Sequence, residues 1–344
     1  MLFKDFLQIS AREIDFEIER FFNDWSNDVE QISSRLLPLV DVLGDACSGG
    51  KRIRGTLVKL GYEMMEARET EEILKLAVAV EIFQTAILCH DDIIDKSPLR
   101  RGRQSLHFRL GGDHEGISKA IILGDIGYFL AFQLIAKSGF GTRQKSRVMG
   151  IFSKMMLETA VGELLDIELT GKEGEDSFFS KKEIISVCEY KTARYTITGP
   201  LMIGAVMGAA REEQVDAIKI FGQNLGIAFQ IRDDINDIFY EKEGFGKEIG
   251  GDIKEGKQTL LYWYARQHAD DEGREILKKY FGNSKIGKGD IGKVREVFEK
   301  SGALDYAKNQ AEEYAARGRE AIVGISKDAS YRDMLLGMTE YFLK

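Results

Sequence analysis

The chain has 344 residues, of which 44% are hydrophobic and 30% charged, and its formal net charge is −8. This is the composition of a globular protein that is long enough for one large domain or two ordinary ones. The negative balance argues against general nucleic-acid binding, which needs a basic surface.

Helical periodicity runs through most of the chain, and only three prolines interrupt it: Pro38, Pro98 and Pro200. In chain order, we predict helices over about 11–43, 51–67, 71–95, 117–138, 143–170, 181–194, 200–208, 212–240 and 258–268, followed by shorter amphipathic helices. Glycine-rich or charged segments predict loops at 44–50, 96–103, 171–176, 241–257 and 282–290. None of these loops resembles a domain linker. We therefore predict an all-α fold with one domain over residues 1–344, in which apolar central helices pack on one another.

The cysteines and the apolar runs predict where the protein is found. Cys47, Cys89 and Cys188 have no CxxC spacing, so we expect free thiols in a reducing compartment rather than disulfides or a zinc site. The first residues carry charges throughout, unlike a signal peptide. The longest uncharged run, 195–210, is shorter than the roughly 20 residues of a membrane span. We expect a cytoplasmic protein with at most peripheral membrane contact.

Two acidic motifs share the spacing DDxxD, and each follows an apolar helical run; their residues are Asp91, Asp92 and Asp95, and Asp233, Asp234 and Asp237. On a helix, the first and last aspartates of such a motif point the same way. Carboxylates this close repel each other unless a cation lies between them. Donors that are all oxygen favour Mg²⁺, which typically takes one or two carboxylates and completes its shell with water and phosphate oxygens. One copy alone would indicate solvated surface, whereas two copies favour a metal site.

Cations beside glycine turns suggest a ligand with several phosphates. The segment "GGKRIRG" (49–55) carries Lys51, Arg52 and Arg54. Further candidates are Arg100, Arg101, Lys191, Lys247 and Lys257. Arginine forks and lysine ammonium groups suit phosphate oxygens, although for each residue alone an ordinary surface cation is an equal alternative. There is no GxxxxGK[ST] loop, so a nucleoside triphosphate is not the expected ligand.

With these motifs in this order, the sequence from about residue 40 to the C-terminus resembles the trans-isoprenyl diphosphate synthases, or polyprenyl synthetases. The family's two aspartate-rich motifs match "HDDIIDKSPLRRG" and "FQIRDDINDIF". The resemblance implies an all-helical barrel of long antiparallel helices around a deep central cavity, usually in a homodimer. It also implies a Mg²⁺-dependent prenyltransferase that condenses isopentenyl diphosphate head-to-tail with an allylic diphosphate.

The resemblance assigns roles to individual residues. Both acidic motifs would hold about three Mg²⁺ ions on the allylic diphosphate and, with Lys191, would form the catalytic centre. Other contacts to the allylic diphosphate would come from Arg100, Lys191, Thr192, Gln230, Lys247 and Lys257. Isopentenyl diphosphate would be held by Gly50, Lys51, Arg54, Gln84 and Arg101. Two positions depart from the family pattern: Gly55 stands where proline is usual, and Glu163 where glutamine is usual.

The implied reaction breaks a C–O bond, and the alkene of isopentenyl diphosphate attacks the allylic cation before a proton leaves. No protein base is obvious in the motifs, so we expect released diphosphate to accept the proton. The 241–257 loop is a candidate lid, with a flexible surface connection as the alternative.

Side chains before the first motif are expected to line a pocket for the growing chain: Phe83, Ala86 and Ile87. Short-product relatives often place an aromatic residue near the last two positions, so the smaller Ala86 and Ile87 favour a C20 or longer product. Phe129 and Phe132 could form a floor, although plain core packing is the alternative. A farnesyl-length product is the alternative.

Two rival functions share parts of this pattern. A terpene cyclase also ionises an allylic diphosphate, but it has no use for the "GGKRIR" segment or a full second DDxxD. A non-catalytic helical subunit of a partner synthase would not need both motifs intact.

Overall fold

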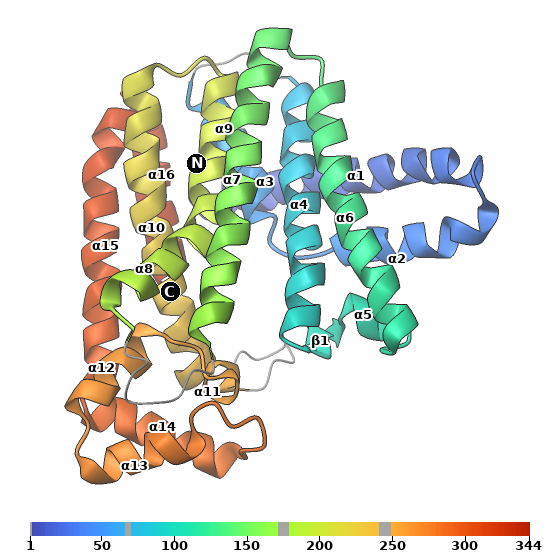
Figure 1. Ribbon diagram of the computed structural model, residues 1–344. Coiled ribbons are helices and arrows are strands. Elements are labelled where there is room, and N and C mark those ends of the chain that lie inside the picture. The colour runs from blue at the N-terminus through green and yellow to red at the C-terminus, as the bar shows by residue number, and fades with distance from the viewer. Residues whose placement is uncertain (1, 66–69, 171–178, 241–248) are drawn as a thin grey trace. The chain divides into compact units, whose positions relative to one another are not determined.

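The structure is a computed structural model that describes residues 2–65, 70–170, 179–240 and 249–344. These residues are almost entirely helical (Figure 1), which confirms the predicted all-α class. They divide into two compact units: unit 1 comprises residues 1–152 with 200–215, and unit 2 comprises 153–199 with 216–344. One domain over 1–344 stays a prediction.

Unit 1 contains most of the N-terminal helices and one small hairpin. Its elements are α1 (Phe3–Glu30), η1 (Ser34–Leu36), α2 (Leu37–Cys47), α3 (Ile53–Glu63), α4 (Glu72–Ile94), β1 (Leu99–Arg100), β2 (Arg103–Gln104), α5 (Leu106–Arg109), α6 (His114–Lys137), the first part of α7 (Thr142–Leu169) and α9 (Gly199–Met207). Helix α4 packs against α1, α3 and α6. The contact with α6 is close because a Cβ on Gly127 would lie only 3.0 Å from the Cβ of Ala86.

Helices α4 and α6 are long and apolar enough to cross a membrane by length and composition. In the structure, 67% of the most apolar window of α4 is buried, and 44% of that of α6. The burial of α4 is that of a core helix, as its lack of a polar face predicts.

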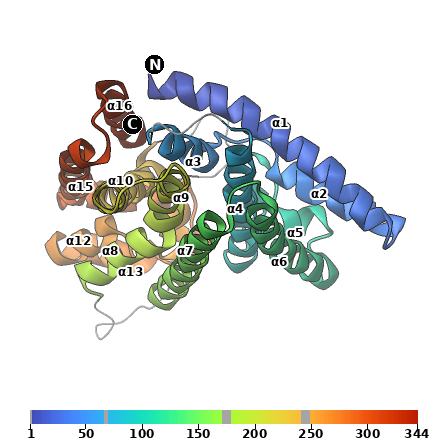
Figure 2. The same ribbon diagram turned by 90° about the horizontal axis from the view of Figure 1, so that it is seen from above.

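The predicted helix over 11–43 is wrong, because α1 and α2 are separate helices that run side by side (Figure 2). Pro38 lies in the first turn of α2, where the missing N–H costs nothing, whereas inside a continuous helix it would break a hydrogen bond. The Ser33 side chain accepts a hydrogen bond from the Arg35 N–H and starts the short η1 turn. The loop predicted at 44–50 is also shorter, since α2 continues to Cys47.

Unit 2 holds the C-terminal helices. Its elements are the second part of α7, α8 (Lys181–Val187), η2 (Cys188–Thr198), α10 (Glu212–Phe239), α11 (Gly251–Glu255), α12 (Leu260–His268), α13 (Asp271–Tyr280), α14 (Lys288–Lys300), α15 (Ala303–Ile325) and α16 (Ala329–Leu343). Apolar side chains of α10, α12, α14 and α15 form its core, among them Ile235, Leu261 and Phe298.

The segment η2 is π-helical, although the sequence predicted an ordinary helix over 181–194. Three glycines bring neighbouring helices onto it. A Cβ on Gly162 of α7 would lie 2.3 Å from the backbone nitrogen of Lys191, and Gly222 and Gly226 of α10 approach Thr198 and Ala193 as closely. This packing holds η2 in a conformation that is rare in proteins and frequent at functional sites.

Candidate active site

The first acidic motif lies at the C-terminal end of α4, in unit 1. Asp92 is buried, while Asp91 and Asp95 are half-buried. The helix ends at Ile94, but the Asp95 N–H still donates to the Asp91 carbonyl oxygen at 2.9 Å. The backbone therefore keeps its helical form through Asp95, as the i, i+4 spacing requires.

The chain turns back directly after α4 and brings Arg100, in β1, to this motif. Lys96 has a positive φ of 52°, and the Ser97 N–H donates to the Asp92 carbonyl oxygen at 2.9 Å. A two-residue turn at Arg101 and Gly102, with φ of 53° and 74°, then joins β1 to β2. The Arg100 Nη2 lies 2.8 Å from Asp91 Oδ2, and its Nε donates to Asp92 Oδ1 at 2.7 Å. Arg100, predicted as a diphosphate contact, is thus bound to two of the predicted metal ligands.

Burial and charge oppose each other at this motif. Burial raises the pKa of Asp92 to about 6, although the Arg100 guanidinium acts in the other direction. Desolvation lowers the pKa of Arg100, but the charges of Asp92 and Asp91 more than reverse this. A buried carboxyl group with a raised pKa is one whose charge is incompletely compensated, as expected where a further cation would bind.

The second acidic motif lies near the C-terminal end of α10, in unit 2. Asp234 is buried and accepts a hydrogen bond from Gln230 Nε2 at 2.7 Å, and Gln230 Oε1 accepts from Thr192 Oγ1 at 2.7 Å. Thr192 and Gln230 were predicted to contact the allylic diphosphate, and the structure brings both to the motif. Asp237 Oδ2 instead accepts the backbone N–H of Asp252 at 3.0 Å, in the first turn of α11.

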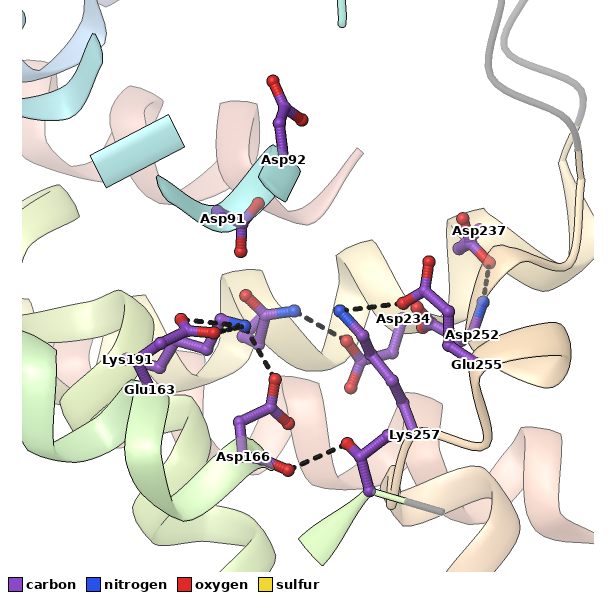
Figure 3. Close-up of polar contacts among 12 residues, drawn as sticks. Asp91, Asp92, Glu163, Asp166, Lys191, Asp234, Asp237, Asp252, Glu255 and Lys257 are labelled. Atoms are coloured by element: carbon purple, nitrogen blue, oxygen red, sulfur yellow. Dashed lines mark hydrogen bonds and ion pairs between the residues drawn. The ribbon is translucent and has the colours of Figure 1, made fainter. Parts of the chain in front are cut away.

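Lys191 lies between two carboxylates of α7 (Figure 3). Its Nζ is 2.7 Å from Asp166 Oδ2 and 3.0 Å from Glu163 Oε2. The sequence analysis singled out Glu163 as a departure from the family pattern but missed Asp166. The signal was present in "GELLD", where the two acids stand three positions apart on one helix face.

The charge of Lys257 acts on Asp234 of the second acidic motif. Its Nζ forms an ion pair with Glu255 at 3.1 Å. Burial raises the pKa of Asp234 to about 7, while the Gln230 hydrogen bond and the Lys257 charge lower it and the Asp233 and Asp166 charges raise it. Lys247, also predicted to bind diphosphate, lies outside the described residues, as does the whole first part of the candidate lid, 241–248. The rest of the predicted loop contains the short helix α11.

The predicted isopentenyl diphosphate residues surround the start of α3 in unit 1. Gly50 has a φ of 91°, Lys51 is exposed, and Arg54 is half-buried. Arg101 Nη1 donates to the Gly49 carbonyl oxygen at 3.4 Å, which ties the hairpin to this loop. Gln84 is half-buried on α4.

The predicted chain-length residues fall into different environments. Phe83 is buried against the rings of Tyr128 and Phe152, and Phe132 meets Phe152 edge-on. Ala86 is fully buried beside Gly127, and Ile87 is half-buried. Phe129 does not fit a pocket floor within this chain, since its side chain is 70% exposed; it lies on the outer face of α6. Helical spacing alone does not show whether Phe129 lies on the buried or the exposed face of its helix.

The donor set fits a hard divalent cation. Both motifs offer only carboxylate oxygens, the ligands that Mg²⁺ prefers. Within the described ranges, no group of three or more Asp, Glu, His or Cys side chains could hold an ion. Mg²⁺ typically binds one or two carboxylates and completes its shell with water and phosphate oxygens.

The sequence matches a known protein family and several of its members. The family model described as polyprenyl synthetase matches residues 38–300. A short chain isoprenyl diphosphate synthase from Methanocaldococcus jannaschii is 31% identical over 76% of this chain and 75% of its own. The geranylgeranyl diphosphate synthase of Sulfolobus acidocaldarius is 29% identical over 90% of this chain and 92% of its own.

Solved structures agree. A geranylgeranyl pyrophosphate synthase from Corynebacterium glutamicum, complexed with isoprenyl diphosphate and magnesium, has a TM-score of 0.90 and 26% identity, covering 100% of this chain and 99% of that one. The predicted fold and family are therefore confirmed, and the chain is a member of the polyprenyl synthetase family.

Proposed function

We propose that this prenyltransferase condenses isopentenyl diphosphate with an allylic diphosphate, in a Mg²⁺-dependent, head-to-tail reaction with trans geometry. The observation that carries the proposal is the Arg100 fork on Asp91 and Asp92. A predicted phosphate-binding cation in β1 and a predicted metal-binding motif at the end of α4 occupy one small region. A site of this composition suits a ligand that carries both phosphate oxygens and divalent cations.

The two acidic motifs, Asp91, Asp92 and Asp95 with Asp233, Asp234 and Asp237, would hold the ions, about three in all. When bound, Mg²⁺ neutralises charge that develops on the leaving diphosphate. Lys191, Arg100 and Lys257 each add positive charge for diphosphate oxygens. Thr192 and Gln230 orient Asp234 through their hydrogen bonds, so that this buried carboxylate keeps one rotamer.

The chain's residues perform the remaining tasks. Gly50, Lys51, Arg54, Gln84 and Arg101 position isopentenyl diphosphate so that its alkene faces the allylic carbon, which makes the encounter effectively intramolecular. As the C–O bond breaks, the electron pair leaves with diphosphate. The alkene then forms the new C–C bond, and the proton lost from the adjacent carbon goes to diphosphate. Apolar side chains around the site exclude water, which would trap the cation.

We propose a product of C20 or longer. The relatives similar over most of the chain include a geranylgeranyl and a geranylfarnesyl diphosphate synthase. Ile87, half-buried one turn before Asp91, is smaller than an aromatic ring and leaves room for a long chain. A farnesyl-length product remains the alternative.

We also propose a homodimer in the cytoplasm, with at most peripheral membrane contact. Large apolar side chains are exposed on two helices. On α6 they include Phe129 (70%) and Ile122 (58%), and on the second part of α7 Leu157 (66%) and Leu164 (62%). On each of these helices the exposure is typical of a surface that another protein covers, and a second copy is the occupant that we propose.

One assay tests the reaction. Labelled isopentenyl diphosphate is incubated with C5, C10 or C15 allylic diphosphates and Mg²⁺, and the products are sized by chromatography. We expect elongation to C20 or beyond and none after chelation with EDTA. Binding without elongation would favour a non-catalytic subunit, whereas a cyclic hydrocarbon from geranylgeranyl diphosphate alone would favour a terpene cyclase.

A further inference from the structure

Helix α1 contacts the segment that is proposed to hold isopentenyl diphosphate. The family model begins at residue 38, so α1 (Phe3–Glu30) lies outside it. Nevertheless Asp15 of α1 reaches Arg52, which stands between Lys51 and the first turn of α3. The Arg52 Nε donates to Asp15 Oδ1 at 2.6 Å, and its Nη2 lies 2.6 Å from the same oxygen.

Arg52 also faces a second carboxylate, from α4. Its Nη1 lies 3.6 Å from Glu81 Oε2, and both side chains are about 97% buried, with exposures of 2% and 3%. Arg52 itself has a φ of 53°, a left-handed conformation that a non-glycine residue adopts at a cost of about 1–3 kcal/mol unless its surroundings fix it. The two carboxylates are the surroundings that fix it here.

Glu81 performs another task in the same segment. Its Oε1 accepts the backbone N–H of Gly55 at 2.8 Å. That N–H is one of the unsatisfied donors at the start of α3, where no side chain of the helix's own cap bonds to the backbone. A proline at this position would have no N–H to donate.

Gly55 also makes room for α1. A Cβ on Gly55 would lie 2.8 Å from the Cδ1 of Ile14, a fully buried residue next to Asp15. Glycine at this position thus permits two contacts at once: the hydrogen bond to Glu81 and the close packing of Ile14. Lys59, one turn further along α3, is ion-paired with Glu13 of α1.

Glu81 acts on the neighbouring arginines as well. Desolvation lowers the pKa of Arg101, and the charges of Arg52, Arg54 and Arg100 lower it further, whereas the Glu81 charge opposes them. A buried carboxylate among these guanidinium groups reduces their mutual repulsion, so that they can lie close enough for one diphosphate.

We propose that Asp15, Glu81 and Gly55 form a clamp that positions Lys51, Arg54 and Arg101 for isopentenyl diphosphate. They are positioning residues that act through Arg52 and the start of α3. The inference rests on the proposed function, because it takes this loop to be the isopentenyl diphosphate site. Its consequence is specific: weakening the clamp lowers the affinity for isopentenyl diphosphate and leaves the allylic site and the chemical step unchanged.

The test compares Asp15→Asn with Asp24→Asn, an exposed residue on the same helix. Binding of isopentenyl diphosphate alone, without metal or allylic substrate, is measured by calorimetry, and KM for each substrate and kcat are measured by turnover. Because Asp15 is half-exposed, we expect Asp15→Asn to raise Kd and KM for isopentenyl diphosphate by only roughly fivefold, with kcat and the allylic KM within about twofold. Asp24→Asn should leave both Kd and KM for isopentenyl diphosphate unchanged.

Two further variants examine the buried part of the clamp. Glu81→Gln keeps an acceptor for the Gly55 N–H but removes the charge opposite Arg52. It should therefore raise both Kd and KM for isopentenyl diphosphate. Gly55→Pro removes the N–H and collides with Ile14, so a larger rise is expected. Thermal melts accompany each variant, and Asp15→Asn, at the surface, decides the matter if the buried variants fail to fold.

Lys51→Ala separates the clamp from the site that it serves. If Lys51→Ala weakens isopentenyl diphosphate binding while Asp15→Asn behaves like Asp24→Asn, the clamp is disproved and the substrate site stands. If Lys51→Ala has no effect, the assignment of the loop fails, and the clamp fails with it. Equal changes of kcat and both KM values in Asp15→Asn would also overturn the clamp, since they would indicate general disruption.

Discussion

The ammonium group of Lys191 lies 2.7 Å from the carboxylate of Asp166. Glu163, on the same face of α7, brings a second carboxylate to within 3.0 Å of that ammonium. One cation therefore faces two anions, and the trio has a net negative charge. A glutamine in place of Glu163 would make the trio neutral, so the second carboxylate holds Lys191 more strongly away from a phosphate.

Replacing Glu163 with glutamine should therefore strengthen diphosphate binding. The amide keeps the shape of the side chain and one hydrogen bond to Lys191, but it has no negative charge that competes with a phosphate for the Lys191 ammonium group. For this partly buried pair, we expect Kd for inorganic diphosphate and KM for the allylic substrate to fall roughly threefold to tenfold. Glu168→Gln, at an exposed position of the same helix, is the matched control. Unchanged or weaker binding in Glu163→Gln would show that Glu163 does not restrain Lys191.

Removing one acidic side chain from either motif should abolish most turnover. Asp91→Ala or Asp233→Ala deletes an oxygen donor for the proposed ions, and we expect kcat to fall on the order of 10³-fold. Circular dichroism melts should show a folded protein, because both side chains are only half-buried. Asp216→Ala, on the exposed surface of α10, is the control for Asp233→Ala. Near-normal rates in either variant would refute the metal assignment.

The chain-length pocket is better examined at Ile87 than at Ala86. If the small Ala86 leaves room for the growing chain, Ala86→Phe shortens the product, but Ala86 is fully buried beside Gly127. A ring there overpacks the contact between α4 and α6 and should lower stability by about 1–3 kcal/mol. Ile87→Phe, at a half-buried position, should instead shorten the product while the melting temperature stays near that of the parent. Product sizing by chromatography decides, and an unchanged length would place the growing chain elsewhere.

The periodicity of the sequence predicted the helices of the core because local spacing determines which residues can be buried together. It also identified both acidic motifs, whose i, i+4 geometry is local. The Arg100 contact depended on a turn directly after α4 with positive φ at Lys96, a conformation that sequence rules assign mainly to glycine and asparagine. The π-helical course of η2 depended on glycines of other helices.

The contacts that were missed altogether connect residues far apart in the chain. Asp15 and Arg52 are separated by 37 positions, and Lys191 and Asp166 by 25. Neither pair is visible in a window of helical spacing, since each depends on how two helices pack. The break between α1 and α2 was missed for a different reason: Pro38 is compatible with the first turn of a helix and so marks a start as readily as an interruption.

The three cysteines should be unreactive in the folded protein. All are buried, and burial raises the pKa of Cys47 to about 12 and that of Cys89 further. Because the thiolate is the reactive form, almost none is present at pH 8 in the native state. We expect no thiols to be titrated by a disulfide reagent at pH 8 before denaturation and all three after unfolding in guanidinium chloride. Rapid reaction of a native thiol would show that one of these sites opens readily.

A charge on either exposed apolar helix should separate the proposed dimer. Phe129 on α6 and Leu164 on α7 are 70% and 62% exposed, so an aspartate at either position stays largely in solvent within its own chain and should leave the fold intact. In a dimer, the same aspartate would be buried against apolar side chains without a partner, which costs several kcal/mol. We expect Phe129→Asp and Leu164→Asp to sediment as monomers at concentrations where the parent sediments as a dimer. Val323→Asp, at a 74% exposed position of α15, should not change the sedimentation. If the parent is itself a monomer, or if the Phe129 and Leu164 variants remain dimeric, this face is not the contact between copies.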